Sequence, residues 1–348
     1  MHFYEEIISS ITPLNEEYMQ KAQERQNNLI KPVGSLGKLE DITIQLAGIY
    51  QSEFFDTSKK AVIAFASDHG VYEEGIAPNA QEITKIQLPN FVRGITGVGA
   101  LAKFAKADVI GIDVGVNCRE KMPGVIDRKI RCSSSNMAKG PAMSRDEAVR
   151  AIEIGIEETL KLIDAGYRVI GIGEMGIGNT TPSSAIISVM GDFEPIEVTG
   201  SGAGLNSEGV IHKAEVIKRA IRLNRPDKED AVDVLAKVGG FEIGAMAGAV
   251  LACAAKRIPV VLDGFISYAA AILAIRLCPL SKLYMIPSHF SAEPASSKAF
   301  SLLDLSPMLQ MDMRLGEGSG AALCFNVIEA ANFAYNNMYT FAEAGFSV

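Results

Sequence analysis

The stretch Ala61-Val62-Ile63-Ala64-Phe65-Ala66-Ser67-Asp68-His69-Gly70 is an apolar run that ends in polar residues and glycine. Helical stretches alternate with five later runs of the same kind, each followed by glycine or polar residues. These runs are residues 109–114, 169–172, 196–198, 260–262 and 283–286. Continuous apolar runs that alternate with helices are typical of a parallel sheet covered on both faces. The sequence therefore predicts an α/β fold.

The polar residues after these runs predict where a ligand binds. The carboxyl ends of parallel strands lie at one edge of a sheet, and ligands bind beyond that edge. Six runs that end in similar residues indicate one shared cleft.

The first sixty residues have a different pattern, with apolar residues at helical spacing. A break follows at residues 31–37, Lys-Pro-Val-Gly-Ser-Leu-Gly, and a second helical stretch begins at Lys38. The residues expected on one face of the first helix are Ile7, Ile8, Ile11, Leu14 and Tyr18.

The C-terminal segment is the expected partner of these N-terminal helices. Ser319 can cap a helix whose positive end would face the cleft. Short helices bury little apolar surface alone, so we expect the two chain ends to pack together. The sequence predicts a small helical domain from residues 1–60 and 319–348, and a parallel α/β domain over residues 61–318 that carries the active site.

The composition excludes several kinds of partner. The 348 residues carry a net charge of −8, so the average surface repels nucleic acid and anionic membranes. The longest apolar run, residues 243–255, is shorter than the ~18 residues of a membrane span. We expect no nucleic-acid partner and no membrane association.

The cysteines and the first residues indicate a cytoplasmic protein. The chain opens with acidic residues where a signal peptide needs a basic region. The cysteines are odd in number and scattered, which is typical of reduced core residues; they are Cys118, Cys132, Cys253, Cys278 and Cys324.

Residues 173–182, Gly-Glu-Met-Gly-Ile-Gly-Asn-Thr-Thr-Pro, form a glycine-rich loop ahead of a helix. Free backbone N–H groups at such a position suit a phosphate. The loop lacks the lysine of a Walker motif. A second glycine-rich turn, residues 200–204, precedes a helix that carries Lys213. Lys213 either supplies the missing cation or is an ordinary solvated lysine.

A formal dinucleotide fingerprint is also present as Gly171-x-Gly173-x-x-Gly176. It leaves open a nicotinamide-dependent oxidoreductase as an alternative function. No acidic residue ends a following strand at the expected distance, and Glu197 is the nearest.

Glu317 lies between two glycines in Leu315-Gly316-Glu317-Gly318. Little side-chain bulk surrounds such a carboxylate, so a ligand can approach it closely. The alternative is an acidic loop residue ahead of an ordinary helix.

Two histidines follow predicted strands without the spacing of a zinc site. His69 and His289 lack a second histidine at helical spacing, and no cysteine pair assists them. We interpret both as structural or ligand-orienting residues and expect no metal. Gly244 and Gly248 share one helix face, which indicates close packing.

Six motifs in this order resemble the nicotinate-nucleotide:dimethylbenzimidazole phosphoribosyltransferases of cobalamin synthesis. The similarity spans nearly the whole chain, and the string at residues 173–181 is its most specific part. The motifs are residues 31–37, 67–71, 173–181, 262–265, 291–294 and 315–318.

The resemblance implies transfer of phosphoribose from nicotinate mononucleotide to dimethylbenzimidazole or a related base, giving α-ribazole phosphate and nicotinate. It also implies a homodimer with a Rossmann-like parallel domain and a small helical domain from both chain ends. No metal or redox cofactor is required.

The resemblance also assigns residue roles. Glu317 matches the general base and Glu174 a second acidic residue of the site. The intact Glu317 disfavours the other alternative, a non-catalytic nucleotide or base sensor. The substrate-binding candidates are Gln87, Gly176, Gly178, Asn179, Thr180, Gly202, Lys213, Asp263, Ser291 and Leu315.

Two segments depart from the family pattern. Ser201 and Ala203 occupy positions where arginine and threonine are frequent, and Ala295-Ser296 replaces a frequent Gly-His. The departures concern the phosphate contacts and the choice of base.

Overall fold

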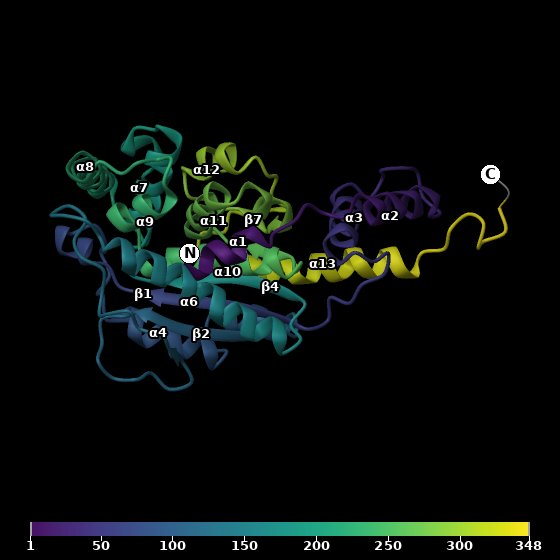
Figure 1. The fold of residues 1–348 in the computed structure, drawn as a ribbon, viewed down its shortest axis with the longest axis horizontal. Coiled ribbons are helices and arrows are strands. Elements are labelled where there is room, and N and C mark those ends of the chain that lie inside the picture. Colours follow the sequence, from purple (N-terminus) through teal and green to yellow (C-terminus); the bar gives the residue numbers. More distant parts are fainter. Residues whose placement is uncertain (1, 347–348) are drawn as a thin grey trace.

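A computed structural model describes residues 2–346 and contains a six-stranded parallel sheet (Figure 1). The strand order is β3-β2-β1-β4-β5-β6, and each neighbouring pair is parallel. The predicted α/β class is therefore confirmed. The strands are β1 (Lys60–Ser67), β2 (Asp108–Gly115), β3 (Ile126–Asp127), β4 (Val169–Met175), β5 (Val260–Leu262) and β6 (Met285–Pro287).

Helices cover both faces of the sheet. Helix α10 (Phe241–Ala255) lies on one face and packs outward against α6 (Arg145–Asp164). The opposite face carries α4 (Ile83–Val92), α5 (Gly97–Phe104) and α13 (Ser319–Asn337). Every residue of β1 is buried, as expected for a central strand between two helical layers.

The remaining elements lie around this core. The other α-helices are α1 (Phe3–Ser9), α2 (Glu16–Asn28), α3 (Lys38–Tyr50), α7 (Thr180–Gly191), α8 (Ser207–Asn224), α9 (Ala231–Val238), α11 (Phe265–Leu277) and α12 (Ser296–Leu303). The 3-10 helices are η1 (Gly70–Glu74), η2 (Pro195–Val198) and η3 (Pro279–Tyr284), and a two-stranded parallel sheet pairs β7 (His289–Phe290) with β8 (Leu309–Gln310).

Two of the predicted strands differ in the structure. Residues 196–198 form the 3-10 helix η2, because Pro195 presets a helical backbone angle and Glu197 bonds back to the N–H of Glu194. The run at residues 283–286 becomes a strand only from Met285, after η3. Apolar composition alone does not separate a short strand from a helical turn.

The prediction that the first helix is continuous was wrong. The structure has α1 and α2 instead, separated by a segment that contains Pro13. Proline removes a backbone donor, so one helix cannot pass through this position without a break. The second predicted helix begins at Lys38, as α3 does.

Close packing of α6 against α10 depends on glycine in both helices. A Cβ on Gly248 would overlap the carbonyl oxygen of Ile152, and one on Gly155 would overlap that of Ala245. Gly244 similarly contacts Ala151. The predicted packing role of Gly244 and Gly248 is confirmed.

Segments from both ends of the chain lie side by side (Figure 1). The Arg25 guanidinium donates to the carbonyl of Tyr335 over 3.2 Å, and Leu29 pairs with Thr340. The first turns of α13 instead pack under β4, where Gly171 leaves room for Ala321. Thus α13 joins the N-terminal helices to the sheet. No helix within residues 2–346 is long and apolar enough to cross a membrane.

Helix α1 packs elsewhere. The N–H of Phe3 bonds to the Glu153 carboxylate of α6 over 3.0 Å, and Tyr4 is buried. We therefore propose that the two-ended helical domain is built from α2, α3 and α13, with α1 attached to the α/β body.

Deletion of residues 1–30 tests this organisation. The deletion removes α2 and uncovers apolar side chains of α3 and α13, so we expect aggregation or loss of cooperative unfolding, measured by circular dichroism during heating. Deletion of residues 1–14 removes α1 but keeps α2, and should be tolerated better. A cooperatively folded, active protein without residues 1–30 would contradict the proposed domain.

Candidate active site

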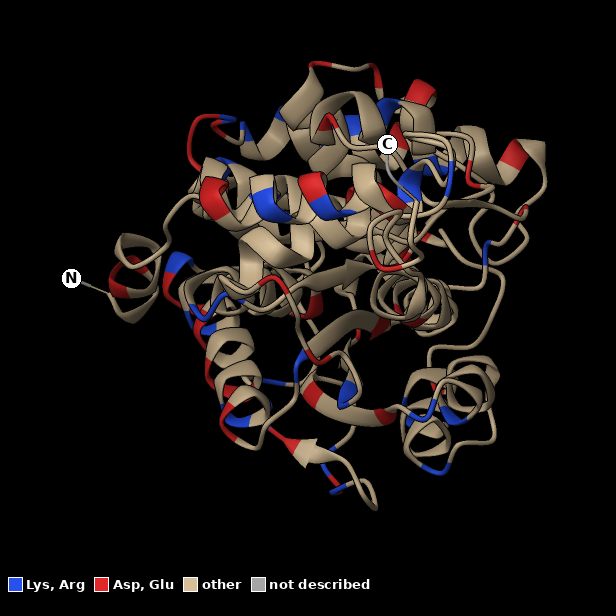
Figure 2. Ribbon diagram, turned by 90° about the vertical axis from the view of Figure 1, so that its right-hand side faces the viewer, with Lys and Arg blue, Asp and Glu red and all other residues tan. Residues whose placement is uncertain are grey.

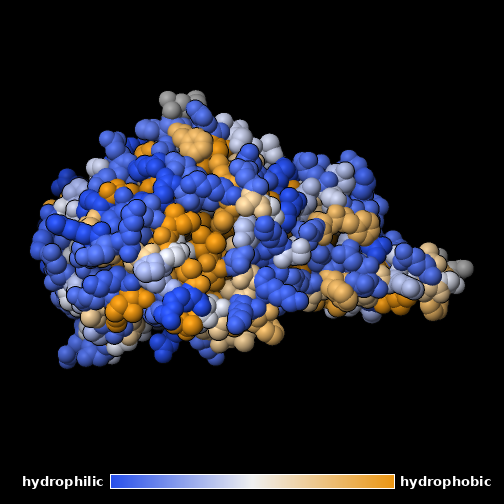
Figure 3. Space-filling view, turned by 90° about the horizontal axis from the view of Figure 1, so that it is seen from below, coloured by the Kyte–Doolittle hydropathy of each residue, from blue (hydrophilic) through white to orange (hydrophobic). Residues whose placement is uncertain are grey.

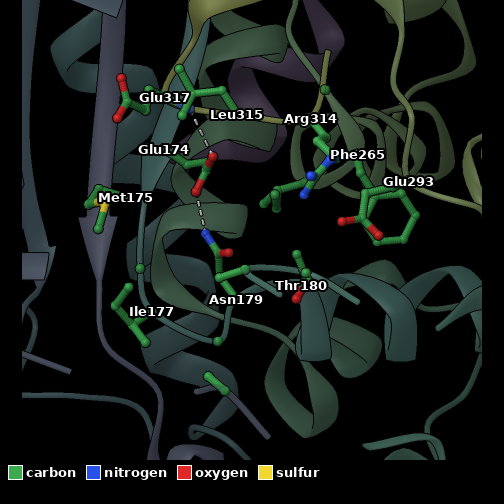
Figure 4. A pocket seen from close by; sticks show the side chains of 18 of the residues that line it. Glu174, Met175, Ile177, Asn179, Thr180, Phe265, Glu293, Arg314, Leu315 and Glu317 are labelled. Atoms are coloured by element: carbon green, nitrogen blue, oxygen red, sulfur yellow. Dashed lines mark hydrogen bonds between the residues drawn. The ribbon is translucent and has the colours of Figure 1, made fainter. Parts of the chain in front are cut away.

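A cavity of about 250 Å³ lies beyond the carboxyl ends of the strands (Figure 4). Its walls come from the loop after β4, the segment ahead of α13, the loop before α8 and the loop after β6. The strand order places β1 and β4 at the centre of the sheet. The cavity lies at the edge where one shared cleft was predicted, but the polar residues that follow β1 and β2 do not line it.

Most of the predicted site residues line this one cavity. Asp263 is the exception, because its carboxylate points at the start of α13 and not into the cavity. The predicted residues that line the cavity are Gln87, Glu174, Gly176, Gly178, Asn179, Thr180, Gly202, Lys213, Ser291, Leu315 and Glu317.

Glu317 has a left-handed backbone conformation with φ of 66°. Gly316 and Gly318 on either side also have positive φ, 81° and 93°. Such angles are unfavourable for a residue with a side chain, and they persist where the surrounding structure holds them. The two glycines therefore let the chain turn sharply enough to aim Glu317 inward.

The Glu317 carboxylate is buried and held by the start of α5. One oxygen, Oε2, accepts the N–H of Val98 over 3.1 Å. Burial raises the pKa of Glu317, while the Val98 N–H lowers it. The Thr96 hydroxyl also lowers the pKa of Glu317. The carboxylate lines the cavity, where it can accept a proton from a ligand.

Asp263 caps α13 in place of the predicted Ser319. Its carboxylate accepts the N–H groups of Gly318 over 3.0 Å, Gly320 over 2.6 Å and Ala321 over 3.3 Å. Ser319 is instead the first residue of the helix. Because a buried carboxylate already meets these donors, the positive end of α13 does not face the cavity as expected. Burial raises the pKa of Asp263 to about 7, against the lowering effect of these donors.

Glu174 joins the glycine-rich loop to the Glu317 turn (Figure 4). Its Oε1 accepts the N–H of Glu317 over 3.2 Å, and its Oε2 accepts the side-chain amide of Asn179. Burial raises the pKa of Glu174 to about 7. One carboxyl group thus fixes both walls of the cavity.

The glycine-rich loop has the geometry of an anion site. Gly178 has φ of 87°, and α7 begins at Thr180. The N–H groups of Gly178 and Thr180 have no hydrogen-bond partner within residues 2–346. Free donors at a helix N-terminus are the usual binding site of a phosphate.

Lys213 is a buried lysine beside this loop. Its side chain is 1% exposed, and its ammonium donates to the Thr180 hydroxyl over 2.6 Å. Of the two interpretations of its sequence position, the solvated helix lysine is excluded. Burial lowers the pKa of Lys213 to about 8.

The formal dinucleotide fingerprint has the wrong geometry. Gly171 and Gly173 lie inside β4, where they make room for α13 and the Glu317 carbonyl. In a dinucleotide site these glycines form the turn that approaches the pyrophosphate. Glu197, the nearest acid, is exposed on η2 and bonds to Lys298.

The two histidines lie at or near the site but are not arranged as metal ligands. His289 is buried beside Gly320, and burial lowers its pKa to about 4. His69 lies 3.1 Å from the Glu242 carboxylate beneath the glycine-rich loop. Within residues 2–346, no three His, Cys, Asp or Glu side chains are grouped to hold a metal ion.

Sequence reasoning did not assign several residues that shape the cavity. Arg314 and Phe265 line it. Arg314 directly precedes the motif at residues 315–318, and Phe265 ends the motif at residues 262–265. Thr84 is buried and its hydroxyl accepts the N–H of Ile177 over 3.1 Å, which ties α4 to the glycine-rich loop. No sequence pattern pointed to Thr84, because the contact spans 93 residues.

Comparisons with known proteins agree with the motifs. A family model described as phosphoribosyltransferase matches residues 11–346. Relatives named nicotinate-nucleotide–dimethylbenzimidazole phosphoribosyltransferase include one from Clostridioides difficile (strain 630), 60% identical over 99% of both chains, and one from Alkaliphilus metalliredigens (strain QYMF), 55% identical over 100% of both. A solved structure of CobT from Thermus thermophilus is 36% identical with a TM-score of 0.90, covering 95% of this chain and 99% of that chain.

The pKa of Lys213 predicts how anion binding depends on pH. Lys213 loses its proton as the pH rises through about 8, whereas a phosphate monoester is already dianionic above its second pKa of ~6. Affinity for ribose 5-phosphate, measured by calorimetry, should therefore fall above pH 8, by at most about tenfold per pH unit. Lys213→Arg keeps a cation and should flatten the profile; an equal fall in this variant would contradict the assignment.

Proposed function

The chain belongs to the family of nicotinate-nucleotide–dimethylbenzimidazole phosphoribosyltransferases, and we propose that Glu317 is the general base of its reaction. The enzyme transfers phosphoribose from nicotinate mononucleotide to dimethylbenzimidazole, which gives α-ribazole phosphate and nicotinate. The buried carboxylate of Glu317, which lines the cavity and is held by the N–H of Val98, is the observation that supports this role.

The reaction exchanges one carbon–nitrogen bond for another. An imidazole nitrogen of the incoming base attacks the anomeric carbon of the ribose, while the bond from that carbon to the pyridine nitrogen breaks. The bonding electrons go to the pyridine nitrogen, which was cationic and leaves neutral. The attacking base acquires a positive charge, which it loses when its other ring N–H gives a proton to Glu317.

The surroundings of Glu317 suit proton abstraction. A carboxylate in water has a pKa of ~4.3 and is a weak base. Burial raises the pKa of Glu317, which makes its carboxylate a stronger base than one in water. The N–H of Val98 holds one oxygen, Oε2, in place. Gln87 and Leu315 also line the cavity, and we propose that they contact the base.

The phosphoribose fits the other end of the cavity. Free N–H groups at Gly178 and Thr180 and the ammonium of Lys213 would bind the phosphate. Glu174 and Asn179 lie between this anion site and Glu317, as Figure 4 shows. They would therefore contact the ribose, and Glu174 would hold the loop and the base at a fixed separation.

The other functions considered from sequence have lost support. The oxidoreductase hypothesis rested on a fingerprint whose glycines lie within β4. A non-catalytic sensor would bind both substrates without turnover. Incubation with nicotinate mononucleotide and dimethylbenzimidazole, followed by chromatography for nicotinate and a new riboside, separates an enzyme from a sensor. Binding without release of nicotinate would overturn the proposed role of Glu317.

We also propose that the enzyme is a homodimer, as the resemblance implies. Helices α4 and α5 and their connection expose Ile86, Ile95 and Phe104, which are 56%, 61% and 75% accessible. Figure 3 views the molecule from the side on which α4 lies and shows apolar residues gathered there, whereas charges of both signs are interspersed in Figure 2. Exposed apolar patches of this kind commonly mark interfaces.

Sedimentation equilibrium tests the oligomeric state. A homodimer should give a mass of twice the 37.2 kDa chain at micromolar concentration. Ile95→Glu places a charge within the exposed apolar patch and should shift the equilibrium toward the monomer. A 37.2 kDa species at all concentrations would contradict the proposal.

Glu317→Gln separates base catalysis from binding. Glutamine keeps the size and the contact with Val98 but cannot remove a proton, so turnover should fall by roughly 10²- to 10⁴-fold. Calorimetry should show little change in affinity for either substrate. Some residual rate is expected because the leaving pyridine is already cationic.

The control for this variant is Glu174→Gln, which removes charge from the carboxyl group that braces the site. It should affect nucleotide affinity as well as turnover. Equal loss of affinity for both substrates in Glu317→Gln would show a structural role, and unchanged turnover would move proton removal to another group.

A further inference from the structure

We propose that Arg314 binds the carboxylate of the nicotinate ring and thereby makes the enzyme prefer nicotinate mononucleotide over nicotinamide mononucleotide. This inference rests on the proposed function and extends it to the selection of the donor. It starts from the charges on the cavity wall and on the substrate.

The cavity has two cationic side chains for two anionic groups. Among the residues that line it, Lys213 and Arg314 carry positive charge. Nicotinate mononucleotide carries a phosphate and a ring carboxylate. Lys213 is fixed at the phosphate end, where its ammonium bonds to Thr180 at the start of α7. Arg314 is left for the carboxylate.

The position of Arg314 fits the path of the leaving group. In an inverting displacement, the attacking base and the departing ring lie on opposite sides of the anomeric carbon. The base would lie beside Glu317. Figure 4 shows Arg314 and Phe265 on the side of the cavity away from Glu317, with Glu174 and Asn179 between the two sides. The departing pyridine ring would therefore lie beside Arg314.

Arg314 has donors free for a ligand. It forms no hydrogen bond or ion pair with residues 2–346, and its side chain is exposed at the cavity. The guanidinium presents parallel N–H groups that match a carboxylate in a bidentate pair. The buried aromatic ring of Phe265 lines the same wall and offers an apolar surface to the pyridine.

Glu293 adds an acidic side chain near the two cationic residues of the cavity, Lys213 and Arg314. Its carboxyl group is 7% exposed and is close enough to Lys213 and Arg314 that both lower its pKa, although burial raises it more. When it is ionised, Glu293 attracts the guanidinium and complements the cationic pyridine nitrogen of the bound donor. Nicotinamide, which lacks the ring carboxylate, would leave Arg314 without a partner.

The test compares three donors, nicotinate mononucleotide, nicotinamide mononucleotide and nicotinate riboside, each with dimethylbenzimidazole in excess. Arg314→Met removes the charge and keeps much of the length. The ratio of kcat/KM for the nicotinate over the nicotinamide nucleotide should fall by roughly 10- to 100-fold, because the loss is confined mainly to the donor with a ring carboxylate. Arg314→Lys should give an intermediate ratio.

Lys213→Met is the matched control from the same cavity. It should lower kcat/KM for both nucleotides by similar factors and leave their ratio nearly unchanged, with little effect on the riboside, which lacks the phosphate. Arg314→Met should instead affect the riboside, which has the carboxylate.

Two outcomes would overturn the proposal. Equal losses for both nucleotides in Arg314→Met, with the riboside unaffected, would place Arg314 at the phosphate. An unchanged ratio would mean that the carboxylate is bound elsewhere. Turnover of the unmodified enzyme is measured in the same series, so absence of the transferase reaction itself can be distinguished from a failure of this proposal. In that case, calorimetry with free nicotinate and free nicotinamide would still measure the selectivity that Arg314 provides.

Discussion

The Asp263 carboxylate at the start of α13 is the interaction on which the site depends. It lies at the end of β5 and meets three N–H groups of the segment that follows Glu317. The contact connects the sheet to a helix that reaches the N-terminal end of the chain. It also determines where the Glu317 turn lies relative to the strands, so a residue outside the cavity positions the proposed general base.

Buried carboxyl groups make this arrangement energetically costly. Glu174 and Asp263 are both buried, and desolvation raises the pKa of each to about 7. The left-handed conformation of Glu317 adds backbone strain. Such features persist because surrounding packing holds them, and here that packing includes β1, β4 and the first turns of α13. The stability of the packed sheet therefore offsets the cost of holding these groups in a fixed geometry at its edge.

The sequence predicted those parts of the fold and the site where the residue types in one short segment already indicate its structure. Continuous apolar runs predicted the parallel sheet, and the glycine-rich loop at residues 173–182 predicted free N–H groups at the start of a helix. Packing of the two chain ends was expected, but the individual side-chain contacts between distant segments were not predictable. The cap on α13 comes from Asp263, more than fifty residues earlier in the chain, whereas local spacing favoured Ser319. The strand expected at residues 196–198 failed because Pro195 and Glu197 stabilise a helical turn locally.

The position of α13 after all six strands of the sheet also constrains synthesis. Glu317 and α13 are made after these strands, yet α13 covers β4 and packs against α3. Until these residues leave the ribosome, the part of this face that α13 covers, at β4, and an apolar face of α3 have no cover. Because exposed apolar surface in a partly made chain promotes aggregation, we expect this protein to depend on chaperones while it is being translated. The active site is then completed in the same step that buries the last open surface of the sheet.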